Sequence, residues 1–284
     1  MQTIKLRTIA LLTFILFIQV LIAKEVKIVI LHTNDTHSRI EPLPKESGNR
    51  NAGLGGILRR EALFNQYRQK EENLLIFDSG DFSQGTPYYN LYKGEVEVKF
   101  MSKLGYDAVT IGNHEFDYGL ENMARLFQEA NFSVVCANYD FSKTLLKDLV
   151  TPYVVLERGG VKIGVFGLGA ALEGLVQAKN YVGVDYLDPI KTANRVVKQL
   201  KEQEKCDLVI CLSHLGLYAS SKYPVSDEVL ARETKDIDLI LGGHSHTFMK
   251  EPKVYLNSEG GNVIISQTGK SGFYVGKIEL YLEK

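Results

Sequence analysis

The stretch LILGGHSHTF, residues 239–248, joins an apolar run to two glycines and then to two histidines that are one residue apart. The whole chain contains six histidines, so this short segment holds two of them. A polar turn would account for the segment, and so would a pair of metal ligands at the end of a buried strand. The rest of the sequence favours the second interpretation.

The same order of residues, an aliphatic run followed by Gly, Asn, Asp or His, occurs at five places. Continuous apolar runs of this length predict strands that are buried on both faces of a sheet. The five segments are VKIVILHTNDTH (26–37), NLLIFDSGD (73–81), YDAVTIGNHEFD (106–117), CDLVICLSHLG (206–216) and IDLILGGHSH (237–246). Each polar cluster is therefore expected where a buried strand ends.

Helical patterns lie between these runs, which predicts an α/β fold with helices outside the sheet strands. Residues 55–73 carry a helical spacing of apolar residues. Residues 188–205 offer Asp188 as N-cap and Pro189 as the first helical residue. Further strands are predicted at VKIGVFGL (161–168), NVIISQT (262–268) and YVGKIELYL (274–282). Periodicity does not distinguish one sheet from two stacked sheets.

Composition is that of a globular protein, since the 284 residues are 45% hydrophobic and 24% charged. Three cysteines, an odd and scattered count, do not form a disulfide framework. Cys136 and Cys211 lie inside apolar runs and are interpreted as buried thiols.

Residues 1–23 have the layout of a secretory signal peptide, with Lys5 and Arg7 ahead of an apolar stretch and Ala23 at the end. An uncleaved membrane anchor formed by residues 9–23 is the alternative, disfavoured because the apolar stretch is short for a spanning helix. Residues 24–284 are expected to form the folded domain.

Export without a disulfide framework suits the bacterial periplasm or the cell surface, which is the predicted location. Loss of residues 1–23 would take the formal net charge from −1 to −3, because Lys5 and Arg7 are removed. No basic stripe is present in the sequence, which argues against a nucleic-acid polymer as partner.

The polar clusters at the strand ends are expected to converge, since ligands of open α/β sheets bind beyond the carboxyl ends of strands. Five of the six histidines belong to these clusters. The candidate site residues are Asp35, His37, Asp81, Asn113, His114, Asp117, His214, His244 and His246.

Carboxylate, imidazole and amide ligands without cysteine suit Zn, Mn or Fe. Asp35 and His37 are one residue apart, so an extended backbone would point both side chains the same way, and the same holds for His244 and His246. The set offers more contacts than one tetrahedral ion needs. Two divalent ions bridged by Asp81 would use all of these ligand contacts. Such a pair of ions stabilises the attacking and leaving oxygens of an in-line phosphoryl displacement.

The segments ILHTNDTH, DSGDFSQGT, IGNHEFDYG, SHLG and GGHSHTF, in this order, resemble the calcineurin-like metallophosphoesterases. Within that superfamily they look like the 5′-nucleotidase branch, and the resemblance covers nearly all of residues 26–284. It implies a metallophosphoesterase catalytic domain with an α-β-β-α sandwich fold, in which two packed mixed sheets are flanked by helices.

The resemblance also implies a role for each residue. One ion would be bound by Asp35, His37, Asp81 and His246, and the other by Asp81, Asn113, His214 and His244. His114 matches the family's catalytic histidine, and Asp117 matches its carboxylate partner, which would fix the imidazole tautomer and raise its basicity.

Several residues have simpler interpretations that remain open here. Asp35, Asp81 and Asp117 are also suited to turns and helix caps, and Asn113 to an ordinary turn. His32 precedes its polar cluster and is assigned a structural role, either buried in the core or in support of the ligands. Gly55–Gly56 lacks a Walker lysine and is expected to pack the start of a helix. Tyr88, Tyr89 and Tyr92 are expected either to stack a base or to lie partly in the core.

The leading functional hypothesis is an exported two-metal phosphohydrolase acting on nucleotides or related phosphate esters. Phosphodiester, nucleotide-sugar diphosphate or thioester hydrolysis at the same site is the second hypothesis, and a non-catalytic metal-binding module is the third. Bacterial 5′-nucleotidases of this type continue into a second domain that recognises the nucleotide. The leading hypothesis therefore covers a chain that acts alone or together with a separate chain carrying such a domain.

Overall fold

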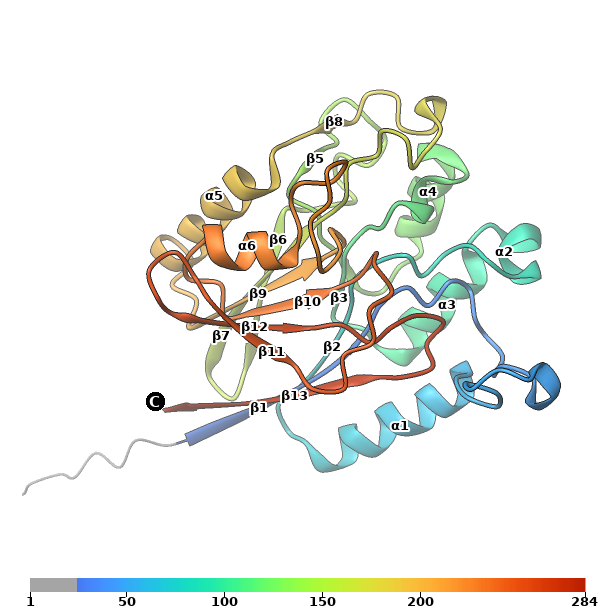
Figure 1. Ribbon diagram of the computed structural model, residues 1–284, viewed down its shortest axis with the longest axis horizontal. Helices are drawn as coiled ribbons and strands as arrows, with labels where there is room; N and C mark the ends of the chain where they lie inside the picture. Colours follow the sequence, from blue (N-terminus) through green and yellow to red (C-terminus); the bar gives the residue numbers. More distant parts are fainter. Residues whose placement is uncertain (1–24, 284) are drawn as a thin grey trace, which may run out of the picture.

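The computed structural model describes residues 25–283, so the signal-peptide or anchor prediction for residues 1–23 lies outside the described residues. Two large sheets form the centre of the described chain (Figure 1). The five-stranded sheet has the order β13-β1-β2-β3-β4 and the six-stranded sheet the order β11-β12-β10-β9-β7-β6. Strands β5 and β8 pair separately.

Both sheets are mixed. The first comprises β1 (Glu25–Thr33), β2 (Leu74–Asp78), β3 (Ala108–Val109), β4 (Ser133–Val134) and the antiparallel edge strand β13 (Gly276–Glu283). The second comprises β6 (Tyr153–Arg158), β7 (Val161–Leu168), β9 (Leu208–Ser213), β10 (Leu239–Gly242), β11 (Lys253–Leu256) and β12 (Asn262–Ser266), with β6 and β11 antiparallel at its edges. The small pair is β5 (Tyr139–Asp140) with β8 (Asp185–Tyr186).

Helices cover the outer face of each sheet. They are α1 (Ile57–Lys70), α2 (Pro87–Tyr92), α3 (Glu95–Leu104), α4 (Gly119–Gln128), α5 (Pro189–Glu202) and α6 (Asp227–Glu233). Three short 3₁₀ helices are η1 (Lys45–Ser47), η2 (His114–Phe116) and η3 (Ala178–Asn180). In Figure 1, α5 and α6 lie on one side of the molecule, and α1 and α3 lie on the other.

Three buried apolar clusters separate four layers. The first packs α1, α3 and α4 on the five-stranded sheet, with Phe64 of α1 fully buried. The second lies between the two sheets and contains Ile28 of β1 and Ile210 of β9. The third packs α5 and α6 on the six-stranded sheet and contains Leu200. The predicted α-β-β-α sandwich is confirmed, and because both faces of each sheet are covered, its strands are continuous apolar runs.

The predicted strands form, but one of them is shorter than predicted. The apolar run within residues 106–117 contributes only the two-residue strand β3, since the chain leaves the sheet after Val109.

The predicted helices also form. Helix α5 begins as predicted, with the Asp188 side chain accepting a hydrogen bond from the Lys191 backbone N–H. Helix α1 follows Gly56, which caps its first turn, as expected for the double glycine. Cys136 and Cys211 are buried thiols, as predicted.

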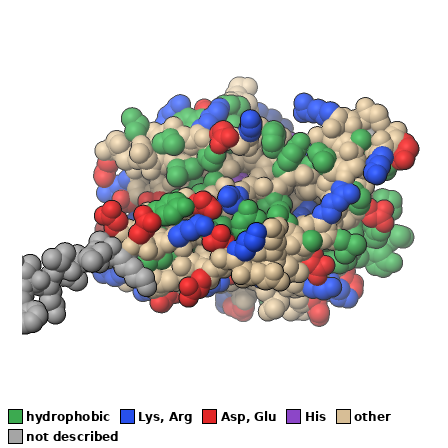
Figure 2. All heavy atoms as spheres, turned by 90° about the horizontal axis from the view of Figure 1, so that it is seen from below, with side chains coloured by type: hydrophobic (Ala, Val, Ile, Leu, Met, Phe, Trp, Pro, Cys, Tyr) green, Lys and Arg blue, Asp and Glu red, His purple; other side chains and the backbone are tan. Residues whose placement is uncertain are grey.

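The outer surface carries both charge signs. On the face shown in Figure 2, basic and acidic side chains are interspersed rather than gathered by sign. Between residues 25 and 283 no helix combines the length and the apolar character needed to cross a membrane.

Candidate metal centre

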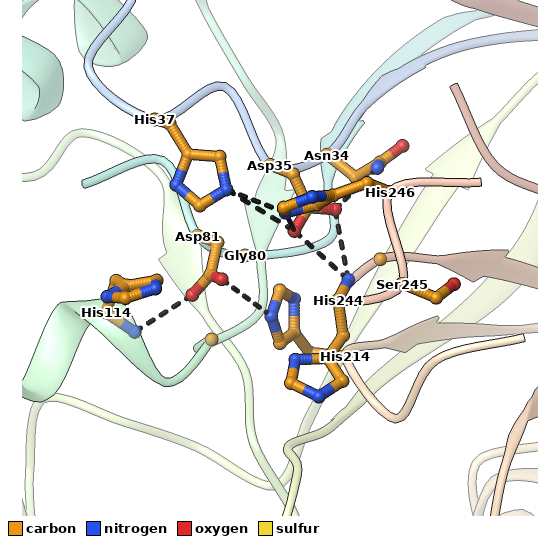
Figure 3. A network of polar contacts seen from close by, with 12 residues as sticks. Asn34, Asp35, His37, Gly80, Asp81, His114, His214, His244, Ser245 and His246 are labelled. Carbon is orange, nitrogen blue, oxygen red and sulfur yellow. Dashed lines mark hydrogen bonds and ion pairs between the residues drawn. The ribbon is translucent and has the colours of Figure 1, made fainter. Parts of the chain in front are cut away.

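All of the candidate site residues follow strands that end at the same edge of the two stacked sheets. Asp35 and His37 follow β1, and Asp81 follows β2. The segment after β3 carries Asn113, His114 and Asp117, and the segments after β9 and β10 carry His214, His244 and His246. Figure 3 shows the side chains from these five segments pointing toward one another. Residues far apart in the sequence thus share one site.

One group of possible ligands consists of Asp35, His37 and His246. Their ligand atoms lie close together: His37 Nε2 is 2.9 Å from His246 Nε2, and Asp35 Oδ1 is 3.4 Å from His246 Nε2. Two atoms bound tetrahedrally to one ion at 2.0–2.1 Å would be about 3.3 Å apart. The spacing of this group therefore fits a shared cation.

Imidazole protonation supports the same conclusion for His37. Its Nδ1 lies 3.3 Å from the Ser83 carbonyl oxygen, so the N–H of the neutral ring is directed there and Nε2 keeps a lone pair. Burial lowers the pKa of His37, which favours this neutral form. A lone pair that faces another imidazole nitrogen at 2.9 Å requires a proton or a metal ion between the two atoms.

A second group consists of Asp81, His214 and His244. His214 Nδ1 donates to the Ser79 carbonyl oxygen over 2.6 Å, which directs Nε2 toward Asp81 Oδ2, 3.1 Å away. Burial opposes charge on both groups, but their mutual attraction outweighs it, lowering the pKa of Asp81 and raising that of His214. A cation placed between them would replace the His214 proton, so metal binding is expected to release a proton.

An unsatisfied buried atom bears directly on whether these residues fit metal ions. Asn113 Oδ1 is among the buried side-chain atoms of residues 25–283 that have no hydrogen-bond partner, and His214 Nε2 has only its ion pair with Asp81 Oδ2 at 3.1 Å. Leaving a buried acceptor unpaired costs about 1–3 kcal/mol. The amide oxygen and the imidazole nitrogen are both ligands for borderline divalent ions, and both residues belong to the ligand set that the family resemblance implies. The donor set therefore fits divalent metal.

The backbone that carries the ligands is not extended, and this corrects the sequence prediction. Asp35, His37, Asp81, His244 and His246 all have positive φ, between 45° and 70°. Non-glycine residues pay about 1–2 kcal/mol for this conformation. The simple alternation of an extended strand is therefore lost, and His244 and His246 belong to different ligand groups instead of pointing the same way.

Two glycines allow the segments to approach one another. A Cβ atom at Gly112 would lie 2.2 Å from Asp81 Oδ1, and a Cβ at Gly243 would lie 2.8 Å from both His214 Nδ1 and the Ser79 carbonyl oxygen. Any side chain at either position would push two ligand-bearing segments apart.

His114 and Asp117 form a pair at the rim of the ligand groups. His114 Nδ1 is 2.9 Å from Asp117 Oδ2, and the His114 backbone N–H donates to Asp81 Oδ1 over 2.9 Å. Burial would lower the pKa of His114, but the hydrogen bond to Asp117 and the charges of Asp81 and Asp117 outweigh it and raise the pKa. The imidazole is therefore held in one orientation and biased toward its cationic form.

Glu115, next to His114, is a residue of the site that the sequence did not reveal. It is 3% exposed, and within residues 25–283 it forms no ion pair with Lys, Arg or His. Its Oε2 accepts backbone N–H groups from Asp81 over 3.0 Å and Gly112 over 2.7 Å, and its Oε1 accepts that of Ser83 over 3.1 Å. Burial, followed by the charge of Asp81, raises the pKa of Glu115. One carboxylate thus ties the segment of Asp81 to the segment of Asn113.

Two amide side chains tie the remaining segments together in the same way. Asn34 donates to Asp35 Oδ2 over 2.6 Å and accepts the Thr268 backbone N–H over 2.8 Å. Gln267 donates to the Gly243 carbonyl oxygen over 2.8 Å and accepts from Ser245 Oγ over 3.0 Å. Sequence reasoning missed both residues because each amide also binds a segment that is remote in the chain.

Replacing Glu115 with glutamine should weaken Mn²⁺ binding by about 10–100-fold, the usual effect of losing a residue that supports metal ligands. An amide offers one acceptor oxygen, and its NH₂ group would face a backbone N–H. Titration of metal-free protein with Mn²⁺ measures the affinity, and thermal unfolding of the same samples measures stability.

Asp238→Asn is the matched control, because Asp238 accepts the Val209 backbone N–H at the opposite end of the sheet. We expect this variant to lose stability but to keep its Mn²⁺ affinity. An equal loss of affinity in both variants would show that Glu115 acts only on general stability.

The other residues considered in the sequence lie as follows. His32 is fully buried, with Nε2 3.0 Å from Ser266 Oγ, which confirms its structural assignment. Tyr89 is buried and donates to the His114 carbonyl oxygen. Tyr88 donates to Glu41 Oε1 over 3.0 Å, and Tyr92 is half-exposed. The three tyrosines therefore do not form a common surface for a base.

Comparison with known proteins agrees with this geometry. The calcineurin-like phosphoesterase family matches residues 28–248. A 5′-nucleotidase of Vibrio cholerae is 36% identical over 232 residues, which cover 78% of this chain and 40% of the relative. The chain thus spans less than half the length of that relative.

Two solved structures share the fold. A 5′-nucleotidase precursor from Thermus thermophilus superimposes with a TM-score of 0.80 at 33% identity, covering 91% of this chain and 54% of that one. A calcineurin-like phosphoesterase from Bacillus subtilis gives a TM-score of 0.74 at 29% identity, covering 92% and 86%. With the family match over most of its length, the chain belongs to the calcineurin-like phosphoesterases.

Proposed function

We propose that this protein is an exported hydrolase of phosphate esters that uses two divalent metal ions. The observation that carries the proposal is the convergence of two ligand groups beside Asp81, with the His114–Asp117 pair at their rim. Nucleotides are the proposed substrates, because relatives that share about a third of its residues are named 5′-nucleotidases. Export rests on residues 1–23 alone.

The ions would be held by the ligands assigned from the sequence, with Asp81 shared between them. When bound, they would supply the positive charge that activates water and stabilises charge on a phosphoryl group. The chain's own contribution follows from its hydrogen bonds. Because Asp117 holds Nδ1 of His114, the Nε2–H of the cationic ring is free to donate to a phosphoryl oxygen.

Asp117 would act through His114, since it fixes the tautomer and stabilises the imidazolium. Glu115 and the two amides, Asn34 and Gln267, would keep the ligand segments in place. A binding module without catalysis would require only the ligands. The hydrogen-bonded His114–Asp117 pair therefore favours a catalytic site over a metal-binding module.

A substrate panel tests the proposal. Because the metal centre recognises the phosphoryl group, the Mn²⁺-reconstituted protein should hydrolyse an aryl phosphate at least as readily as a nucleoside monophosphate. Adenine and uracil nucleotides should be hydrolysed at similar rates. Initial rates for an aryl phosphate, AMP and UMP provide the measurement.

Two results would contradict the proposal in different ways. Failure to hydrolyse any ester in the panel would refute phosphoester hydrolysis. Strong selection for one base would refute the expectation that the site senses only the phosphoryl group and what is attached directly to it.

A further inference from the structure

A cavity of about 210 Å³ lies at the N-terminal end of helix α1. Its walls include Gly55 and Gly56 before the helix, Arg59 and Arg60 in the first turn, and Gly272 before β13. One water molecule occupies about 30 Å³ in the liquid, so the cavity has room for a small polyatomic ion. None of these five residues belongs to the candidate metal centre, and the proposed reaction does not use them.

The start of α1 carries positive charge that the helix itself does not balance. Its first turn contains no acidic residue, and Gly56 offers no side-chain cap to the backbone N–H groups. Arg59 and Arg60 lie where the helix dipole is positive, and cations in the first turn of a helix are unfavourable. Glu61, the next residue, pairs with Lys103 at 3.6 Å. An anion at this end of the helix would relieve the repulsion.

The guanidinium of Arg60 is buried with two of its nitrogens unsatisfied. The residue is 5% exposed, and Nε and Nη2 are among the buried side-chain atoms of residues 25–283 that have no hydrogen-bond partner. These two nitrogens present the parallel N–H groups with which arginine binds a phosphate or a carboxylate. A Cβ atom at Gly272 would overlap Nη2, so this end of the guanidinium lies against the wall of the cavity. Buried charges are ordinarily paired and hydrogen-bonded, so an acceptor is missing at this point.

Two buried groups near Arg60 are engaged elsewhere. Asp78 Oδ2 accepts the Thr33 hydroxyl over 2.5 Å, and Asp78 Oδ1 accepts the Gly80 backbone N–H over 2.9 Å. Burial raises the pKa of Asp78 to about 7 against the opposing charge of Arg60, so this carboxyl is only a partial counter-charge near neutral pH. Burial also raises the pKa of Tyr106, against the charge of Arg60 and a hydrogen bond with it. Neither group satisfies Nε and Nη2.

We propose that this cavity binds a small oxyanion of the chemical class of inorganic phosphate. Arg60 would donate to the ion from Nε and Nη2, and the dipole of α1 would stabilise its negative charge. The backbone N–H of Ser271, next to Gly272, donates to the Asp35 carbonyl oxygen over 2.7 Å. An ion held between Arg60 and Gly272 would therefore stabilise a segment that contacts the metal centre. The site is separate from the proposed hydrolysis and does not depend on it.

Calorimetric titration of the metal-free full-length chain with inorganic phosphate tests the site, since phosphate then has no metal ion to bind. The unmodified protein should bind one phosphate ion per chain. Arg60→Gln should weaken binding about 10–100-fold, the usual effect of losing hydrogen bonds from a charged donor. Leu63→Phe keeps Arg60 but fills part of the cavity, and it should weaken binding as well. Arg68→Gln is the matched control, because it removes the same charge from the last turn of α1 and should leave the affinity unchanged.

Thermal unfolding of the same samples shows which variants are folded. Binding that is weakened in Arg60→Gln and kept in Arg68→Gln supports the site. If Arg60→Gln does not fold, Leu63→Phe decides in the same way. Absence of phosphate binding by the unmodified chain would overturn the inference. Unchanged affinity in the folded Arg60 or Leu63 variant would also overturn it, because the phosphate would then lie elsewhere, and phosphoester hydrolysis would be unaffected by either result.

Discussion

Replacing Asp81 with asparagine should abolish the binding of both proposed metal ions. Asp81 lies 3.1 Å from His214 of one ligand group, and its carboxylate also lies within 4.8 Å of a ring nitrogen of His37, which belongs to the other group, so it is placed between the two sets of ligands. Elemental analysis after reconstitution with Mn or Zn should give about two ions per chain for the unmodified protein, as in other two-metal sites. Asp81→Asn should fall well below one, and phosphoester hydrolysis should be lost with the metal.

His246→Ala is the matched comparison for this experiment. His246 belongs only to the group with Asp35 and His37, so its loss should weaken mainly one ion. A content fixed at one ion per well-folded unmodified chain would refute the two-metal proposal. Retention of two ions by Asp81→Asn would refute the bridging role of that residue.

The same samples test the effect of metal on stability. A ligand that binds only the folded state stabilises it. Ligands that come from five segments, several of them with left-handed backbone, should also depend on the cation to offset their mutual repulsion and strain. Metal-free protein should therefore unfold at a lower temperature than the reconstituted protein, and Asp81→Asn should show little difference between the two conditions.

His114→Ala should reduce turnover by about 10²–10⁴, the usual effect of removing a positioned proton-transfer or charge-stabilising group. Metal content should remain close to that of the unmodified protein. His114 approaches Asp81 through its backbone N–H, which alanine retains. Steady-state kinetics and elemental analysis of the same preparation provide the two measurements. Parallel loss of metal and activity would show that His114 is a metal ligand.

Asp117→Asn should cause a smaller loss in the same direction and should also move the pH profile. Asp117 raises the pKa of His114 through its hydrogen bond and its negative charge, so replacing the carboxylate with a neutral amide should lower that pKa. The cationic imidazole is present below its pKa and is lost as the pH rises through it. The alkaline limb of kcat/KM should therefore shift to lower pH in Asp117→Asn. An unchanged profile would remove His114 from the role of cationic donor.

The residue types at the site could be predicted from the sequence because their signals are local. An apolar run such as residues 239–242 predicts a buried strand wherever it lies, and the polar residues that follow must be at its end. Imidazole, carboxylate and amide ligands restrict the choice of metal before any geometry is known. Asp188 and Pro189 likewise mark the beginning of a helix through local hydrogen bonding and backbone restriction.

Only the tertiary structure showed how the backbone brings these residues together. The left-handed backbone at His244 and His246 sends the two side chains to different ligand groups, a division that the family resemblance implied but that spacing along an extended strand could not show. Glu115 became recognisable only through the three backbone N–H groups that it accepts from two segments. Residue type and short-range pattern are properties of the chain itself. The burial of a side chain, its hydrogen-bond partners and the direction in which it points arise only when separate strands pack together. The sequence by itself therefore determined which groups this protein brings to its metal centre, and the packing of the two sheets determined which of them face one another.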